Sequence, residues 1–289
     1  MLPAPFEYHR PETLEEALQL LAEHGEDAKV LAGGQSLIPL MKLRFAAPGR
    51  LIDVNRIAGL DGIEETEGFL RIGALVRHNA LAASEVIKER YPTIAVAAPM
   101  ISDPIVRNLG TIGGSLAHAD PSGDLESVML ALGATVVVRS NDGEREIAAV
   151  DLADGPFQSS IAPNELLTEI RVPSAPRRSG GTYLKLERRV GDFATVAVAI
   201  CLTLENGSIG RAGIALTSVG LTNLKANAAE ASLVGASPGE SAFAEAGRLA
   251  AAAAEPATDV RGSADYKRHV VDVYVRRGLA AATEMAGAA

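Results

Sequence analysis

The chain has 289 residues, of which 47% are hydrophobic and 22% are charged, and this composition excludes a disordered protein. Its formal net charge of -9 excludes a protein that binds nucleic acids through a general basic surface. The single cysteine, Cys201, excludes an intrachain disulfide and a cysteine-ligated metal centre held by this chain alone.

The length allows roughly two domains with large buried cores, so a multidomain chain is the starting expectation. No apolar run approaches the roughly 18 residues that a membrane-spanning helix requires. The first residues, from Met1 to Tyr8, lack the basic and apolar regions of a secretory signal. We therefore expect no transmembrane segment and a cytoplasmic location.

Residues 1–57 are predicted to form a small α/β unit. Leucine and alanine residues recur at helical spacing over 11–24, and the short apolar runs at 29–32 and 51–54 are typical of strands. A further helix is expected over 37–45. The order of strand, glycine-bearing loop and helix start is one in which a loop backbone can meet a phosphate group.

A second unit, residues 58–175, is predicted to end in a linker rich in proline, serine and glycine. Asn141-Asp142-Gly143 indicates a hairpin turn within this unit. Strands are expected at 69–75, 135–138, 144–148 and 166–172, and helices at 79–90, at 92–98 and between Ser122 and Gly133.

Residues 176–289 are predicted to form a C-terminal domain. Its strands read as an antiparallel meander with a turn at Asn206-Gly207, and alanine-rich helices are expected to cover the sheet. The strands are expected at 182–188, 193–204 and near 211–217, and the helices near 226–234, 240–254 and 263–284. The fold class of the whole chain is therefore α+β.

The first of two glycine pairs lies in Ala32-Gly33-Gly34-Gln35-Ser36, shortly after Lys29. Glycine reaches positive φ at little cost and can bring bare N–H groups against a ligand. These groups, the side chains of Gln35 and Ser36 and the dipole of the following helix can together bind a phosphate. A plain tight turn is the alternative, because the segment matches neither the dinucleotide fingerprint nor the P-loop.

A similar motif, Thr111-Ile112-Gly113-Gly114-Ser115, follows further along the chain and is predicted to be a second loop. Two such loops suggest two walls of one anion site. Asp124 falls in the first turn of the next helix, where it can cap that helix or accept from ribose hydroxyl groups. His118 and Asp120 have no third ligand at a suitable spacing, which favours a loop-ordering role over a metal site.

The first strand of the C-terminal domain carries Lys185, which points to the opposite face from Leu186. Lys185 can therefore approach a cofactor between the two domains, and the alternative is a solvated face of salt bridges. There is no G-x-S-x-G elbow and no histidine beside a candidate nucleophile, so hydrolytic catalysis is weakly supported. Cys201 lies in an apolar strand, where a small buried hydrophobe is expected.

The segments Lys29 to Pro39, Thr111 to Gly114 and Tyr183 to Asp192 occur in this order, and through them the chain resembles the FAD-binding medium subunits of molybdenum hydroxylases. The likeness extends to the medium chains of aerobic carbon monoxide dehydrogenase and to the FAD-binding subunits of xanthine dehydrogenase. It implies a two-subdomain FAD-binding domain of the vanillyl-alcohol oxidase/p-cresol methylhydroxylase type. A small flavoprotein C-terminal domain of antiparallel sheet and helices would follow.

The resemblance also implies a set of FAD contacts, and no catalytic or metal-binding residue. The backbones of both glycine motifs would hold the pyrophosphate, with Lys29 near the adenosine and Asp124 on a polar group of the cofactor. Leu167 and Lys185 would flank the isoalloxazine, whose exposed side would lie near two further residues. The implied residues are Lys29, Ala32, Gly33, Gly34, Gln35, Ser36, Thr111, Gly113, Gly114, Ser115, Asp124, Leu167, Lys185, Asp192 and Phe193.

Two residues depart from the pattern expected of carbon monoxide dehydrogenases. Phe193 stands near a position where a tyrosine is expected, and Gln35 stands where those enzymes tend to carry histidine. Both departures weaken an assignment to carbon monoxide as the substrate, and neither affects FAD binding.

The function implied by the resemblance is that of an FAD-binding electron-transfer subunit in a heterotrimeric molybdenum hydroxylase. A large partner would hold the molybdenum cofactor and a small partner two [2Fe–2S] clusters, and two heterotrimers would pair. Electrons would pass from the clusters through FAD to an external acceptor. Two alternatives stay open: a stand-alone flavin-dependent oxidoreductase with its own substrate pocket, and a cofactor-free scaffold for assembly.

Overall fold

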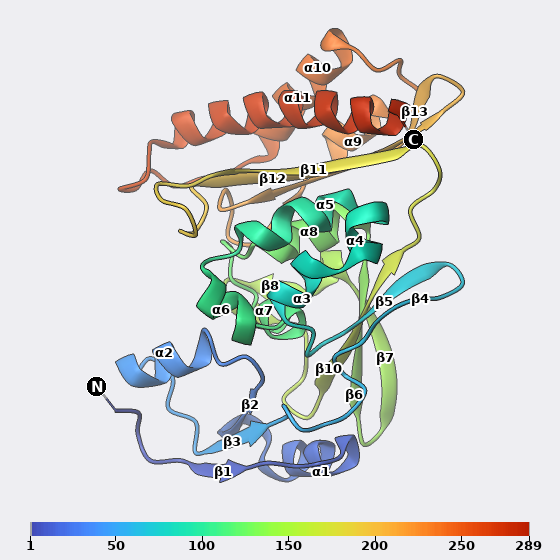
Figure 1. Ribbon diagram of the computed structural model, residues 1–289. Coiled ribbons are helices and arrows are strands. Elements are labelled where there is room, and N and C mark those ends of the chain that lie inside the picture. The colour runs from blue at the N-terminus through green and yellow to red at the C-terminus, as the bar shows by residue number, and fades with distance from the viewer. Residues whose placement is uncertain (1, 289) are drawn as a thin grey trace.

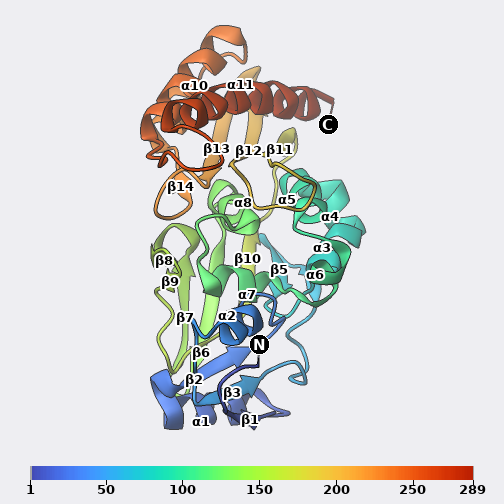
Figure 2. The ribbon, with the colours of Figure 1, turned by 90° about the vertical axis from the view of Figure 1, so that its left-hand side faces the viewer.

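A computed structural model describes residues 2–288, and its three larger sheets are stacked in chain order along the length of the molecule (Figure 1). The N-terminal sheet lies at one end, the C-terminal sheet and its helices lie at the other, and the largest sheet lies between them (Figures 1 and 2). This arrangement confirms the α+β class. Within the described residues, no helix is both long and apolar enough to cross a membrane.

The N-terminal sheet is parallel and has the strand order β1-β3-β2. The Thr13 hydroxyl accepts from Glu16 N–H at 3.2 Å and so caps the first helix, and Gly25 ends it at a φ of 51°. One face of this helix packs its apolar residues into a small core under the sheet. The elements are β1 (Glu7–His9), α1 (Leu14–His24), η1 (Gly25–Asp27), β2 (Ala28–Leu31), α2 (Leu37–Leu43) and β3 (Arg50–Asp53).

The central sheet is antiparallel and has the order β4-β5-β10-β6-β7. Alternation along its strands places Leu70 and Ile72 in the core with the helices, while Arg71 forms an ion pair with Glu169 at 2.6 Å on the other face. The strands are β4 (Ile63–Glu65), β5 (Phe69–Gly73), β6 (Thr135–Ser140), β7 (Gly143–Ala148) and β10 (Leu166–Pro173), with a separate pair β8 (Ala153–Gly155) and β9 (Gln158–Ser159). The helices are α3 (His78–Ala83), α4 (Glu85–Arg90), α5 (Pro92–Ala97), η2 (Ala98–Met100), α6 (Pro104–Leu109), α7 (Ile112–His118), α8 (Asp124–Leu132) and η3 (Ala149–Asp151).

The C-terminal sheet lies between two layers of helices (Figure 1). In its second strand, Ala197 and Ala199 face the core that contains α5 and α8, whereas Val198 and Ile200 face the C-terminal helices. Small residues on one face allow the sheet to sit close to α5 and α8. The elements are β11 (Ser179–Leu186), β12 (Val196–Glu205), β13 (Ser208–Thr217), β14 (Leu224–Lys225), α9 (Asn227–Leu233), α10 (Glu240–Ala253) and α11 (Ala264–Ala288).

The structure differs from the sequence-based elements at two places that matter for the site. The helix expected over 79–90 is two helices, because Ser84 leaves the helical conformation and its hydroxyl accepts from Ile87 N–H as a new cap. The second glycine motif was predicted to be a loop, and that prediction is wrong. Gly113 and Gly114 lie in the first turn of α7.

Candidate functional site

The first glycine motif connects β2 to α2 and presents a cluster of free donors. Gly34 has a φ of 70°, and the Gln35 side chain folds back to donate to the Gly33 carbonyl at 2.9 Å. Among residues 2–288, no acceptor lies within hydrogen-bond distance of the backbone N–H groups of residues 33–36. Four such groups at a turn ahead of a helix can bind an anion.

The second glycine motif has a different role from the one expected. Thr111 caps α7, since its hydroxyl accepts from Gly114 N–H at 3.1 Å, and Gly113 N–H donates to the Ala74 carbonyl at 2.9 Å. These N–H groups are therefore not bare, contrary to the expectation of a second open loop. A Cβ on Gly113 would lie 2.6 Å from Ala74 Cβ, so this glycine allows close packing on the central sheet. Gly114 is exposed and leaves the surface beside the first motif uncovered.

The two glycine motifs meet in space. A Cβ added to Gly33 would overlap the Leu109 carbonyl oxygen and would lie 2.7 Å from Gly110 Cα. A Cβ on Gly114 would lie 3.9 Å from Ala32 Cβ. The sequence left open whether two segments so far apart in the chain come together, and the structure shows that they lie in contact.

Asp124 and Lys185 form a buried ion pair that joins α8 to β11 of the C-terminal sheet. Lys185 Nζ donates to Asp124 Oδ2 at 2.9 Å and to the Met100 carbonyl at 3.1 Å, and Tyr183 Oη donates to Asp124 Oδ1 at 2.7 Å. The Lys185 side chain is 1% exposed. Burial raises the pKa of Asp124, and the Lys185 cation opposes that shift. A solvated face at Lys185 is therefore excluded, and the Asp124 carboxylate binds the C-terminal sheet instead of capping its own helix.

The remaining predicted residues lie in three different environments. Lys29 is exposed on β2, and Leu167 belongs to the buried core. Asp192 accepts from Arg261 at 3.1 Å and from Phe193 N–H at 2.8 Å, which orders the turn before the half-exposed Phe193 ring. This ring borders a polar pocket of about 210 Å³ between the segment that joins α7 to α8 and the C-terminal domain, lined by Asp120, Ser122, Phe193, Ala194, Thr195, Ser218, Asp259, Arg261 and Lys267.

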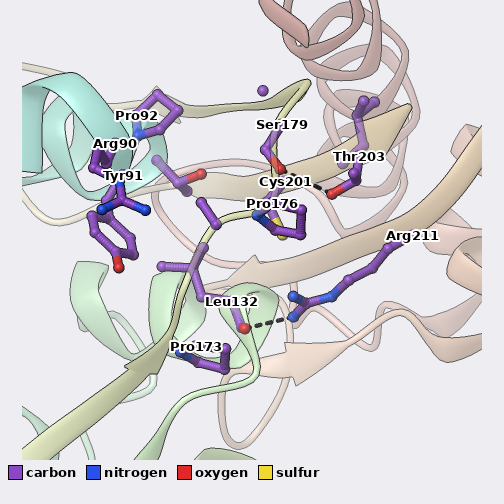
Figure 3. A pocket seen from close by; sticks show the side chains of 14 residues that line it. Arg90, Tyr91, Pro92, Leu132, Pro173, Pro176, Ser179, Cys201, Thr203 and Arg211 are labelled. Carbon is purple, nitrogen blue, oxygen red and sulfur yellow. Dashed lines mark hydrogen bonds between the residues drawn. The ribbon is translucent and has the colours of Figure 1, made fainter. Parts of the chain in front are cut away.

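A second pocket contains none of the predicted site residues (Figure 3). It lies where the linker at Pro173–Pro176 passes the start of α5 and Cys201 of β12. The Cys201 thiol donates to the Ala131 carbonyl at 3.1 Å, and burial raises its pKa to about 11. Because the thiol stays protonated at neutral pH, Cys201 is not a nucleophile there.

Sequence reasoning missed two polar residues beside the glycine motifs, Asn55 and Arg77. Asn55 Nδ2 donates to the Ala32 carbonyl at 2.8 Å, and Arg77 Nη2 donates to Asn55 Oδ1 at 2.6 Å. Arg77 Nη1 also donates to the Leu109 carbonyl. No periodicity or spacing reveals these contacts, because each joins segments that are distant in the chain.

Glu126 is a buried carboxyl group close to the polar pocket. Asn223 Nδ2 donates to its Oε2 at 2.7 Å, whereas its Oε1 has no partner among the described residues. Burial, with repulsion from Asp120 and Asp124, raises the pKa of Glu126 to about 9. The carboxyl group is therefore protonated at neutral pH.

We expect Glu126→Gln to stabilise the protein at pH 8 relative to the wild type. Because the folded state holds the Glu126 proton more tightly than the unfolded state, with its ordinary pKa of 4.5, stability falls as the pH rises from 4.5 through about 9. At pH 7 this costs on the order of 3 kcal/mol. Urea unfolding at pH 4, 6 and 8 should show the advantage of the variant growing with pH. Exposed Glu89→Gln is the control, and a pH-independent difference for Glu126→Gln would contradict the prediction.

Comparison with known proteins identifies the family of the chain. A family model described as the FAD binding domain in molybdopterin dehydrogenase matches residues 4–175, which include both glycine motifs and the Asn55–Arg77 contact. The chain belongs to this family of FAD-binding subunits of molybdenum hydroxylases. A second model, the CO dehydrogenase flavoprotein C-terminal domain, matches residues 181–282. Both matches confirm the predicted resemblance, and FAD is the cofactor of the family.

Individual members are similar over nearly the whole chain. The chain is 42% identical to the carbon monoxide dehydrogenase medium chain of Hydrogenophaga pseudoflava, covering 98% of both proteins. It is 41% identical to the 6-hydroxypseudooxynicotine dehydrogenase complex subunit alpha of Paenarthrobacter nicotinovorans, covering 99% of this chain and 97% of that one. A solved carbon monoxide dehydrogenase from H. pseudoflava that lacks the Mo-pyranopterin moiety matches at a TM-score of 0.96, with 44% identity and 99% of each chain covered. Similar members therefore belong to enzymes named for different substrates.

Proposed function

We propose that this chain is the electron-transfer subunit of a heterotrimeric molybdenum hydroxylase. It would pass electrons from the [2Fe–2S] clusters of a small partner subunit through FAD to an external acceptor, while a large partner holds the molybdenum cofactor. Two heterotrimers would pair, as the family resemblance implies. The observation that carries the proposal is the cluster of free N–H groups at residues 33–36, in a chain of an FAD-binding family. Relatives named as a medium chain and as a complex subunit support the assembly.

The residues at the glycine motifs fit the pyrophosphate of FAD. Residues 33–36 offer backbone N–H groups that have no acceptor among the described residues, and a diphosphate oxygen satisfies such donors. Ser115 adds a partly exposed hydroxyl group, whereas the buried Thr111 hydroxyl holds the first turn of α7. Gly114 keeps the surface between the motifs free of a side chain. Lys29 is proposed to lie on the adenosine side. The first motif thus contributes the backbone donors, and the second contributes the Ser115 hydroxyl and open space beside Gly114.

The isoalloxazine end of the site is proposed to lie toward the C-terminal domain. The buried Lys185–Asp124 pair would lie beneath that end of the site, with its two charges bound to each other, with Leu167 as apolar support and Asp192 holding the turn that carries Phe193. FAD, when bound, supplies reversible redox chemistry, and the protein supplies binding, orientation and electrostatics. We propose a division into residues 1–57, 58–175 and 176–289, supported by the three separate sheets. A cytoplasmic location remains a prediction.

Purification of the full chain with the proteins that accompany it tests this function. We expect about one FAD per chain from the absorbance spectrum, and molybdenum and iron only in co-purified partner chains. Oxidation of a hydroxylatable substrate should require those partners. A chain that carries no flavin and takes up no added FAD would overturn the proposal. Turnover by the isolated chain would favour the stand-alone flavin oxidoreductase instead.

A further inference from the structure

A chain of hydrogen bonds runs from one glycine motif to the other through two side chains. It starts at the Ala32 carbonyl, which accepts from Asn55 Nδ2 at 2.8 Å, and continues from Asn55 Oδ1 to Arg77 Nη2 at 2.6 Å. Arg77 Nη1 completes it at the Leu109 carbonyl, the group that a Cβ on Gly33 would overlap. The guanidinium thus links the segment before Thr111 to the side chain that holds Ala32.

The orientation of the Asn55 amide is set by its neighbours. Its Nδ2 donates to Asp53 Oδ1 at 2.7 Å as well as to Ala32, so its Oδ1 is left to accept from the Arg77 cation. The reverse orientation would place the amide oxygen against a carboxylate and a carbonyl, and the amide nitrogen against a guanidinium. Only one orientation of the amide satisfies all three neighbouring groups, the Asp53 carboxylate, the Ala32 carbonyl and the Arg77 guanidinium.

Arg77 is itself fixed to the second motif by its backbone. It forms an isolated antiparallel bridge with Thr111, in which Ile112 N–H donates to the Val76 carbonyl at 3.0 Å and His78 N–H donates to the Gly110 carbonyl at 3.0 Å. Within residues 2–288, no direct hydrogen bond joins segment 32–36 to segment 109–115. The Asn55–Arg77 contact is therefore the polar connection that holds the first motif against the second.

We propose that Asn55 and Arg77 are positioning residues that set the separation of the two glycine motifs and thereby the affinity for FAD. The inference rests on the proposed function, since it assumes that the pyrophosphate lies between the motifs. Groups that bind a ligand must be held in place by surrounding hydrogen bonds. Around metal ligands, loss of such support commonly costs about tenfold to a hundredfold in affinity, and we expect an effect of the same order here. Neither side chain needs to touch the cofactor for this effect.

The test measures FAD dissociation constants of the full chain for Asn55→Ala, Arg77→Met and the double variant. We expect each single variant to bind FAD about tenfold or more weakly, and the double variant to bind no worse than the weaker single one, because either change breaks the same connection. Arg56→Met is the matched control. The Arg56 guanidinium forms only an exposed pair with Glu12 at 3.4 Å, so its replacement should leave FAD affinity unchanged.

Urea unfolding of the FAD-free proteins separates positioning from general stability. Asn55 is exposed, so Asn55→Ala should unfold close to the wild-type midpoint while still binding FAD weakly. Arg77→Lys, which keeps the charge and loses the fork of donors, should fall between wild type and Arg77→Met. Wild-type affinity in either original single variant, or losses that add fully in the double variant, would overturn the inference and leave the proposed function standing. A wild-type chain that binds no FAD would overturn both.

Discussion

Gly33→Ala should weaken FAD binding by about a hundredfold or more. A methyl group at this position would overlap the Leu109 carbonyl oxygen and meet Gly110 Cα at 2.7 Å, and both are backbone atoms that no rotamer change can move. The two glycine motifs must therefore separate, which displaces the free N–H groups of residues 33–36 from the surface around Gly114. Isothermal titration of the flavin-free chain with FAD measures the effect.

Gly62→Ala is the matched control for this substitution. A Cβ at Gly62 would make only an ordinary van der Waals contact, 3.5 Å from Glu64 Oε1. It should bind FAD as the wild type does. The unfolding of both variants without FAD must also be measured, since separation of the motifs is expected to lower stability by about 1–3 kcal/mol. A folded Gly33→Ala chain with wild-type FAD affinity would show that the cofactor does not lie between the motifs.

Lys185→Met should destabilise the protein by about 3–5 kcal/mol. The substitution keeps the apolar length of the side chain but leaves Asp124 with only the Tyr183 hydroxyl as a partner, in a place where the carboxylate is 9% exposed. A buried charge without its counter-charge is far more costly than a missing surface pair. Urea unfolding of the flavin-free chain at pH 7 measures the loss.

A second substitution distinguishes the lost ion pair from lost packing. Asp124→Asn combined with Lys185→Met removes the two charges of this pair, while Glu187, whose Oε2 lies 3.6 Å from Lys185 Nζ, still loses its counter-charge. The double variant should therefore regain part, but not all, of the stability that Lys185→Met loses. Lys88→Met, which breaks an exposed pair with Glu85, should change stability by less than about 1 kcal/mol. A loss for Lys185→Met as small as that for Lys88→Met would contradict a buried pair.

Local signals in the sequence are sufficient to predict most helices and long strands. The heptad-like spacing of Leu14, Leu18 and Leu21 marks α1, and the hairpin turn at Asn141-Asp142-Gly143 marks the junction of β6 and β7. The three-residue strand β1 has no such signal, because its place is set by pairing with β3, far along the chain. The glycines of α7 were assigned to a loop because adjacent glycines disfavour a helix, and the Thr111 cap and contact with Ala74 outweigh that preference.

The candidate site was predictable where one segment carries the chemistry. The glycines and polar residues of the first motif are enough to predict a cluster of hydrogen-bond donors. Asp124 and Lys185 are each predicted to be site residues. Their contact with each other was not predicted, because it depends on how β11 packs on α8, and no local pattern reports the burial of a lysine. Asn55 and Arg77 were missed for the same reason.

Hydrogen exchange of the full chain with and without FAD tests most directly whether the glycine motifs hold the cofactor. The N–H groups of residues 33–36 have no acceptor among the described residues, so they should exchange rapidly in the flavin-free chain and slow markedly when FAD binds. Amides of the exposed β6–β7 turn around Asp142 should not change. FAD binding that leaves residues 33–36 exchanging at the flavin-free rate would contradict the assignment of the pyrophosphate to this site.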